Sequence, residues 1–307
     1  MSTARIDPTG TQVQLRREGP NGEVTAQLSE VGASLRHLTV GGVDIVPPYP
    51  AGRMAPSCSG VVLVPWPNRI RDGIWTQRGE TRQLAVTEPA KGTAIHGLLR
   101  FAPYDIEQTA DAAVLSATVF PQVGYPFALE TSVQYQLTDD GIEVTHTIRN
   151  IGEGDAPVAI GTHPFFTIGD ADTAELVLTV PAATWFEVDE RLLPLVESEV
   201  SGDRDLRGGQ RLADAHFDTA FGQLARDEDG LVRSTLRAPD GRTVTLWQDA
   251  SFNWVQVYTT TAYPGVDHAV AVEPMTAPID AFNSGDGLVW LAPGEDFMAR
   301  WGVTFTR

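Results

Sequence analysis

The chain has 307 residues, and its 40 acidic against 22 basic side chains give a formal net charge of −18 at pH 7. A surface of this sign repels nucleic acid and anionic lipid, so we expect neither a nucleic-acid nor a membrane partner. The N-terminal sequence MSTARIDPTG lacks the apolar core of a signal peptide, and no apolar run reaches the roughly 18 residues that span a bilayer. These features predict a soluble, cytoplasmic protein.

Glycine and proline are frequent, with 29 and 21 copies, and long amphipathic helical patterns are scarce. Such a composition favours many short strands joined by tight turns. No linker-like segment and no internal repeat with a period of about 20 to 50 residues interrupts the chain. We therefore predict a mainly β fold with antiparallel strands, in a single domain that covers residues 1–307.

The first strands are predicted between residues 11 and 46, where apolar and polar residues alternate between Asn-Gly and Gly-Gly turn signals. The next stretch, GVVLVPWPNRIRDGIW, is an apolar strand followed by Pro-Trp-Pro. The prolines pre-set a rigid loop that is predicted to expose Asn68, Arg69 and Arg71 at a cleft. The alternative is a structural loop whose arginines pair with surface acids.

The lone cysteine, Cys58, excludes an internal disulfide and is expected to be a small buried residue rather than a nucleophile. No Cys/His pair has zinc-site spacing, so no metal is predicted.

Histidines stand in contrasting contexts along the chain. His96 ends a short apolar run and precedes a glycine, which fits either a buried imidazole or a site residue. His146 lies within an alternating strand between threonines and is predicted to face solvent. His163 follows a buried-looking strand and precedes a proline, in VAIGTHPFF. His216, in a polar stretch, is predicted to lie on the surface.

The stretch VAVEPMTAPIDAFNS places Glu273 at the end of an apolar run, directly before Pro274. Because proline cannot continue a central ladder, the strand is predicted to stop there. The carboxylate is then either a paired core charge or a working acid or base. Two strands that each bring a titratable residue to a proline, together with His96 and Arg69, predict a convergent polar cluster.

A buried carboxylate beside a neutral histidine is typical of an acid/base pair. No GxSxG elbow, Walker loop or GxGxxG motif occurs in its required context. The pair suits the interconversion of sugar anomers, in which one group removes the anomeric hydroxyl proton while another protonates the ring oxygen. Burial raises the pKa of a glutamic acid from about 4.3 towards the roughly 6.5 of histidine, which helps the exchange.

The strings LVPWPNRIRDGIW, AIHGLL, GTHPFF, HFDTAF and VEPMTAPIDAFN, in this order, resemble the aldose 1-epimerase (galactose mutarotase) family. The resemblance covers nearly the whole chain and implies a large antiparallel β-sandwich of the galactose mutarotase-like supersandwich type, with no cofactor. By the resemblance, Glu273 is the general base and His163 the general acid. Arg69 and His96 are implied to bind substrate, and Asp218 to hydrogen-bond sugar hydroxyls. Asn68, on the same predicted loop as Arg69, is a further candidate substrate-binding residue.

The resemblance implies a small sugar as substrate, such as free glucose or galactose, and we expect a monomer or homodimer. Trp66 fits either the core or a platform for the apolar face of a sugar. The segment from His96 to Arg100 is closer to the HG-x-x-R of hexose-6-phosphate epimerase relatives than to the HGG of galactose mutarotases. Arg100 then either reaches an anionic group at C6 or bonds a backbone carbonyl. The alternatives are therefore an epimerase for a 6-phosphorylated or 6-sulfonated hexose, or a non-catalytic sugar-binding module.

Overall fold

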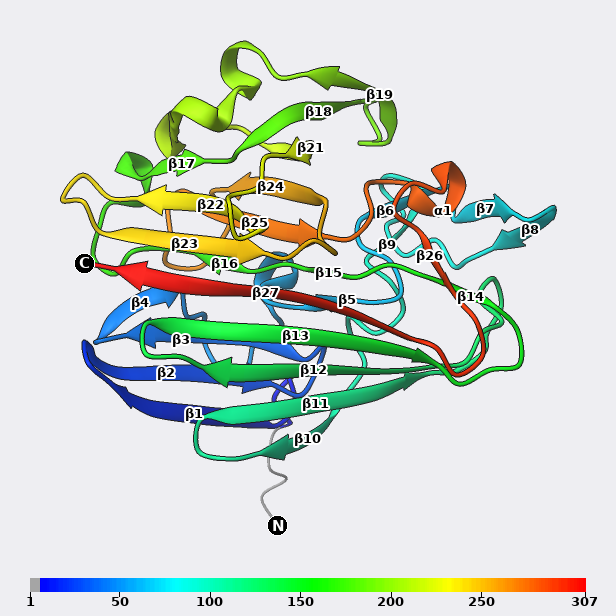
Figure 1. The fold of residues 1–307 in the computed structure, drawn as a ribbon, viewed down its shortest axis with the longest axis horizontal. Helices are drawn as coiled ribbons and strands as arrows, with labels where there is room; N and C mark the ends of the chain where they lie inside the picture. Colours follow the sequence, from blue (N-terminus) through cyan, green and yellow to red (C-terminus); the bar gives the residue numbers. More distant parts are fainter. Residues whose placement is uncertain (1–5) are drawn as a thin grey trace.

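The structure, a computed structural model, describes residues 6–307, and its regular secondary structure consists mainly of antiparallel strands (Figure 1). The two largest sheets contain nine and eight strands. The nine-stranded sheet has the order β10 (Asp105–Gln108), β11 (Ala112–Val119), β12 (Leu129–Leu137), β13 (Gly141–Asn150), β27 (Asp296–Thr306), β23 (Thr243–Gln248), β22 (Val232–Arg237), β17 (Val177–Thr179) and β20 (Gln210–Arg211).

The eight-stranded sheet supplies most of the residues discussed below. An additional strand, β16 (Phe165–Phe166), pairs with β25 beside the main path. The main path has seven strands in the order β19 (Pro194–Glu199), β18 (Ala182–Val188), β21 (Asp218–Leu224), β24 (Trp254–Thr260), β25 (Ala269–Met275), β15 (Gly161–Thr162) and β5 (Val62–Leu63), and β16 is the eighth strand of the sheet.

A four-stranded sheet forms the N-terminal layer, as the alternation between residues 11 and 46 predicts. It consists of β1 (Gln12–Gly19), β2 (Gly22–Ser29), β3 (Ser34–Val40) and β4 (Val43–Val46). Gly41 and Gly42 both have positive φ, at 56° and 79°, which suits the tight turn between β3 and β4. Strands β1 and β2 contact β12, and β3 contacts β13, so this sheet packs on the nine-stranded sheet (Figure 1). The predicted large antiparallel β-sandwich is confirmed.

The interior is a continuous apolar core that includes Leu15 of β1, Val144 of β13, Val257 of β24 and Trp301 of β27. No helix among residues 6–307 is long and apolar enough to cross a membrane. Several smaller elements lie around the core. They are β6 (Arg69–Arg71) with β9 (Thr93–Ile95), β7 (Ile74–Gln77) with β8 (Glu80–Gln83), β14 (Ala156–Val158) with β26 (Val289–Leu291), the helix α1 (Ala281–Ser284), and the 3-10 helices η1 (Pro56–Cys58), η2 (Thr173–Glu175), η3 (Gly202–Arg204), η4 (Leu206–Gly208) and η5 (Leu212–Asp214).

The prediction that His146 faces solvent is wrong. Its side chain is 1% exposed, and its Nε2 accepts a hydrogen bond from Trp301 Nε1 at 2.9 Å. The alternation along β13 is real, but its phase is opposite, because Val144 and Ile148 share the buried face with His146. Burial lowers the pKa of this imidazole to about 3, so it is neutral in the fold. We assign it a packing role.

Candidate functional site

Glu273 lies within β25, a strand in which every residue is buried, and the Glu273 side chain is only 2% exposed. The predicted stop before Pro274 is wrong, because β25 continues to Met275 while it stays paired with β24, where Pro274 lies opposite Val255. The cross-strand partner of Glu273 is Gln256. The carboxylate therefore sits inside a sheet rather than at its fraying end.

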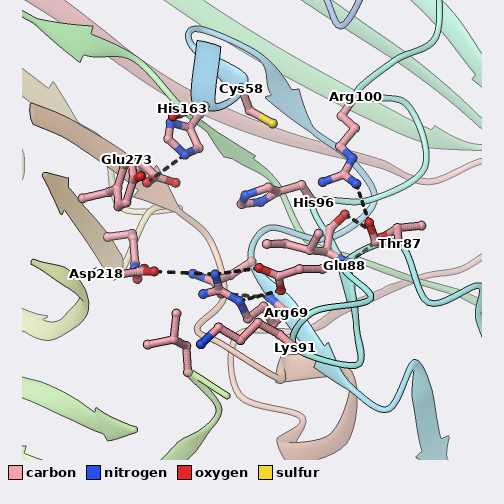
Figure 2. Close-up of a pocket in the computed structure, with 16 residues that line it drawn as sticks. Cys58, Arg69, Thr87, Glu88, Lys91, His96, Arg100, His163, Asp218 and Glu273 are labelled. Atoms are coloured by element: carbon pink, nitrogen blue, oxygen red, sulfur yellow. Dashed lines mark hydrogen bonds and ion pairs between the residues drawn. The ribbon is translucent and has the colours of Figure 1, made fainter. Parts of the chain in front are cut away.

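His163 lies in the two-residue gap between β15 and β16, at the apolar strand end that the sequence indicates. Its backbone N–H donates to Val61 O at 3.1 Å, which holds the gap against the neighbouring β5 segment. The imidazole stacks on Phe165 with a ring-centroid distance of 5.5 Å. In this position its Nε2 lies 3.3 Å from Glu273 Oε1 (Figure 2).

Arg69 is a member of β6, so the prediction of an exposed loop is wrong for Asn68 and Arg69, which are 2% and 8% exposed. Pairing of β6 with β9, which places Arg69 opposite Ile95, buries this segment. The guanidinium donates from Nε and Nη2 to the two carboxylate oxygens of Glu88, at 2.8 and 3.1 Å. Its Nη2 also lies 3.5 Å from Asp218 Oδ2.

His96 follows β9 in a left-handed backbone conformation, with φ at 62°. Its N–H donates to Asn68 O at 2.9 Å, and Asn68 itself has φ at 53°. The glycine after it is required, since a Cβ on Gly97 would meet Val64 O at 2.1 Å. This turn brings the His96 ring edge-on to His163, with centroids 5.6 Å apart.

Asp218 begins β21, next to β24 in the same sheet as Glu273. Its Oδ1 accepts a hydrogen bond from Gln256 Nε2 at 2.6 Å, and its Oδ2 faces Arg69. The side-chain amide of Gln256 thus holds the Asp218 carboxylate in place. The backbone of Gln256 is paired across the ladder with Glu273, which carries the other carboxyl group.

The six side chains singled out from the sequence line one cavity of about 420 Å³ (Figure 2). In Figure 2, Glu273 and His163 lie on one side of it and Arg100 lies on the other, with His96 between them. A second group of residues lines the same cavity and was not anticipated as part of the site. The six side chains predicted from the sequence are those of Asn68, Arg69, His96, His163, Asp218 and Glu273. The second group includes Glu88, Lys91, Leu192, Gln256 and Tyr258.

Burial dominates the electrostatics of the cavity. It raises the pKa of Glu273 well above the ordinary value of 4.5; nearby Asp218 adds to this rise, and Arg69 opposes it. Burial, with a smaller contribution from the Arg69 cation, lowers the pKa of His163 to about 4. The pKa of His96 is lowered well below 6.5 by burial and by His163. Burial therefore favours the neutral form of both imidazoles.

Several buried polar atoms of the cavity have no hydrogen-bond partner among residues 6–307. They are Nδ1 of His96, Nδ1 of His163, Oε1 of Gln256 and Oε2 of Glu273. Buried polar groups in folded proteins are nearly always paired, so this unused capacity indicates a polar ligand. In the same described part of the chain, no group of three or more His, Cys, Asp or Glu side chains could hold a metal ion.

The remaining candidate residues take different positions in the structure. Trp66 is core, with its ring 5.3 Å from that of Phe282, so it is not a ligand platform. Cys58 lines the cavity, and burial raises the pKa of its thiol, which disfavours the thiolate. Arg71 lies 3.7 Å from Asp189, so it pairs with an acid as the alternative predicted, but it does so from strand β6 and not from a loop. His216 is exposed, as predicted.

Arg100 bonds a backbone carbonyl, which is one of the two alternatives predicted for it. Its Nη2 donates to the backbone carbonyl of Thr87 at 3.2 Å, yet the side chain also lines the cavity.

Two residues that hold the site together were missed in the sequence. Glu88 stands in the polar loop TEPAKG, where nothing local marks it as the partner of Arg69. Gln256 interrupts the apolar run of the strand WVQVY, and a buried amide there is the one local sign of a special position. Only the register of β24 against β25 places that amide beside Glu273.

Comparison with known proteins gives a consistent result. The sequence profile described as aldose 1-epimerase matches residues 18–303. The chain is 35% identical over 278 residues to the uncharacterized protein YihR of Escherichia coli K12, covering 89% of this chain and 88% of that protein.

Solved structures show the same fold at low sequence identity. A putative aldose 1-epimerase from E. coli K12 has a TM-score of 0.81 at 17% identity, covering 96% of this chain and 99% of that one. A galactose mutarotase-like protein from Clostridium acetobutylicum has a TM-score of 0.82 at 17% identity, with 96% and 95% covered. The GalM/aldose epimerase homologue from C. elegans has a TM-score of 0.81 at 18% identity, with 97% and 99% covered.

Proposed function

The chain belongs to the aldose 1-epimerase family, and from that premise we propose that it interconverts the α and β anomers of a free aldohexose such as glucose or galactose. The observation that carries the proposal is the 3.3 Å contact between His163 Nε2 and Glu273 Oε1 in the buried cavity. At about 420 Å³, the cavity lies within the usual range for small-molecule sites, about 300–1,000 Å³.

The reaction needs two proton transfers at neighbouring oxygens of the sugar. Glu273 removes the proton from the anomeric hydroxyl, and His163 gives a proton to the ring oxygen as the bond between C1 and that oxygen breaks. The product is the open-chain aldehyde, which turns about its C1–C2 bond. Ring closure reverses both transfers, so the two side chains end in their starting states and no cofactor is required.

A single proton shared by the pair is sufficient for this cycle. Burial raises the pKa of Glu273 and lowers that of His163, so before the sugar binds the shared proton favours the carboxyl group. The short contact provides the route by which it passes to the imidazole, which creates the base and the acid together. Each unit by which the two pKa values differ costs about 1.4 kcal/mol in this transfer.

The other cavity residues orient the sugar. Arg69, held by Glu88 and Asp218, offers N–H donors in a fixed plane. Asp218 accepts hydrogen bonds from sugar hydroxyls, and His96 and Asn68 complete the polar wall. Misplacing the sugar by a fraction of a bond length would slow proton transfer, so these residues are expected to influence both KM and kcat.

The test is anomer exchange measured by NMR on a panel of aldohexoses. We expect the protein to accelerate the α/β exchange of at least one free hexose in a saturable manner. Saturable binding without any acceleration on the whole panel would contradict the proposal and leave a sugar-binding module. Absence of both binding and acceleration would exclude all of the tested sugars as ligands.

A second candidate substrate is an aldohexose with an anionic group at C6. The observation in its favour is that Arg100 and Lys91 line the cavity without an ion-pair partner among residues 6–307, in a protein of net charge −18. The Lys91 ammonium donates only to the backbone carbonyl of Glu190, at 2.7 Å. Two cations that form no ion pair within the described chain and line a polar cavity suit a phosphate or sulfonate group.

The exchange panel separates the two substrates when 6-phosphorylated and 6-sulfonated hexoses are added to it. If the anionic sugar is the substrate, Arg100→Gln should raise its KM by about tenfold or more, since a hydrogen bond to a charged group contributes about 1.5–3 kcal/mol. Exchange of the neutral hexose serves as the internal control and should change little. Equal use of neutral and anionic sugars by both proteins would reject this candidate.

A further inference from the structure

We propose that Leu192 is a further substrate-binding residue, which packs against the apolar C–H face of the bound sugar ring and is held over the cavity by a strained turn. The inference rests on the proposed function, because it takes the ligand to be a pyranose. Leu192 lines the same cavity as Glu273 and His163. It comes from the connection between β18 and β19, outside the segments that resemble the family motifs.

The first observation is the backbone of Leu192, whose φ is 62°. The turn is closed by a hydrogen bond from Leu192 N–H to Asp189 O at 2.9 Å and by another from Asp189 N–H to Leu193 O at 3.0 Å. In hairpin loops of this kind the left-handed position is ordinarily taken by glycine. For a bulky side chain such a φ is an outlier, and outliers of this kind cluster at ligand sites.

The second observation is that the turn is tied to the loop forming the adjoining part of the cavity. Arg191 donates from Nε to Lys91 O at 2.8 Å and from Nη2 to Gly92 O at 3.0 Å. Its Nη2 also bonds Asp72 Oδ1 at 2.6 Å, and Lys91 Nζ returns a bond to Glu190 O at 2.7 Å. These contacts fix the backbone on both sides of the strained position.

The third observation is the composition of the cavity wall. Ile95 and Leu192 are its aliphatic residues, and most of the other lining side chains are polar or charged. A pyranose ring presents patches of C–H groups as well as hydroxyls, and such patches bind to apolar side chains. Because Trp66 lies in the core, the ring finds no indole platform there, and Leu192 supplies apolar surface in its place.

The experiment replaces Leu192 with residues that suit the turn but lack the apolar side chain. Leu192→Gly and Leu192→Asn both accept positive φ, so each should fold at least as well as the wild type. Burial of a leucine side chain corresponds to a tenfold or greater change in affinity, so we expect both variants to raise KM for the preferred sugar by about tenfold, with kcat changed less. Leu192→Met should restore a KM close to that of the wild type.

The matched control is Gln223→Gly. Gln223 is exposed, has φ at 48° and lies outside the lining of the cavity, so its replacement relieves the same kind of strain without touching the sugar. Its KM should be that of the wild type. Sugar affinity is measured by titration calorimetry beside the exchange rate, so that binding is tested even without turnover.

The outcomes separate the two proposals. An unchanged KM and affinity in Leu192→Gly, with an active wild type, overturns the role of Leu192 and leaves the proposed function intact. A wild type that binds sugar without exchanging its anomers overturns the catalytic proposal, and the affinity of Leu192→Gly still decides the inference. A wild type that neither binds nor exchanges any pyranose overturns both.

Discussion

Glu273 and Asp218 bring two carboxyl groups into one cavity, and the two groups differ in their hydrogen-bond and ion-pair partners. Asp218 has partners for both oxygens, in Gln256 and Arg69. Glu273 has only the His163 contact, and its Oε2 has no partner among the described residues. The carboxyl group with raised pKa is therefore the one left free to exchange protons, which is the usual sign of a working acid or base.

Glu273→Gln tests that distinction by two measurements. Because a positioned proton-transfer group contributes about 10²–10⁴ in rate, the anomer exchange rate should fall by that factor while sugar affinity stays within about tenfold. His163→Asn should behave likewise. A normal exchange rate per folded molecule would refute the catalytic role.

The same variant makes a prediction about stability. The folded-state pKa of Glu273 is raised above 4.5, so the wild-type fold loses stability as pH rises from the unfolded pKa towards the folded one. Glutamine cannot ionise, so the Tm of Glu273→Gln should exceed the wild-type Tm at pH 8, and the difference should shrink at pH 4. A variant that is less stable at pH 8 would instead indicate that the carboxylate is a structural ion-pair partner.

The pH dependence of catalysis follows from the single shared proton. The pair takes up a second proton below about pH 4, the value to which the pKa of His163 is lowered. It loses its only proton above the raised pKa of Glu273. We expect a bell-shaped profile of kcat/KM whose two limbs belong to the pair as a whole. Loss of activity at the ordinary glutamic acid value of 4.5 would contradict the raised pKa, and the residual activity of Glu273→Gln should lack the upper limb.

At the scale of elements, Asp280 joins two parts of the site. Just before α1, its N–H donates to Arg69 O at 2.8 Å, and its Oδ1 accepts from Arg71 N–H at 3.0 Å. One residue thus holds β6 on both sides of Ile70, directly after Arg69. Asp280 also has φ at 61°, which aspartate tolerates better than most residues.

Asp280→Ala should therefore destabilise the protein by on the order of 3 kcal/mol, because it leaves buried N–H groups without an acceptor and places alanine in a left-handed conformation. It should also raise KM, since β6 carries Arg69. Urea unfolding and exchange kinetics measure the two effects. Asp280→Gly removes the acceptor oxygen without straining the backbone. Asp280→Asn keeps an acceptor oxygen and tolerates the left-handed conformation, so it should stay close to the wild type. Wild-type stability of the alanine variant would contradict this account.

At the scale of the whole molecule, the core extends from β1 to β27, and we propose that residues 1–307 form one domain. A single core predicts one cooperative unfolding transition. Tryptophan fluorescence and far-UV circular dichroism should give coincident urea curves, because the tryptophans lie in several parts of the chain. Two separated transitions would show that the sheets unfold independently.

The whole described chain also bears on metal dependence. Residues 6–307 contain no group of three or more His, Cys, Asp or Glu side chains that could hold a metal ion, and an acid/base pair needs none. We expect the exchange rate to be unchanged after exhaustive dialysis against a chelator. Activity that is lost and then returns with zinc or manganese would contradict the assignment of Glu273 and His163.

Local features of the sequence determined the class of fold and the family. Alternating apolar residues, glycine turns and prolines are properties of short segments, so the antiparallel strands of β1–β4 could be predicted without tertiary contacts. The motifs around Arg69, His96, His163, Asp218 and Glu273 carried the family resemblance, because each is continuous along the chain. The structure brings their side chains into one cavity.

Only the tertiary structure decided which distant groups meet. The phase of β13, and with it the burial of His146, depends on the sheet that covers each face. Strand register places Gln256 beside Glu273, and the pairing of Glu88 with Arg69 joins segments that have no shared local pattern. The left-handed backbone of Leu192 is likewise maintained by contacts with another loop. Hydrogen bonds and packing between segments set these features, and a linear pattern does not contain them.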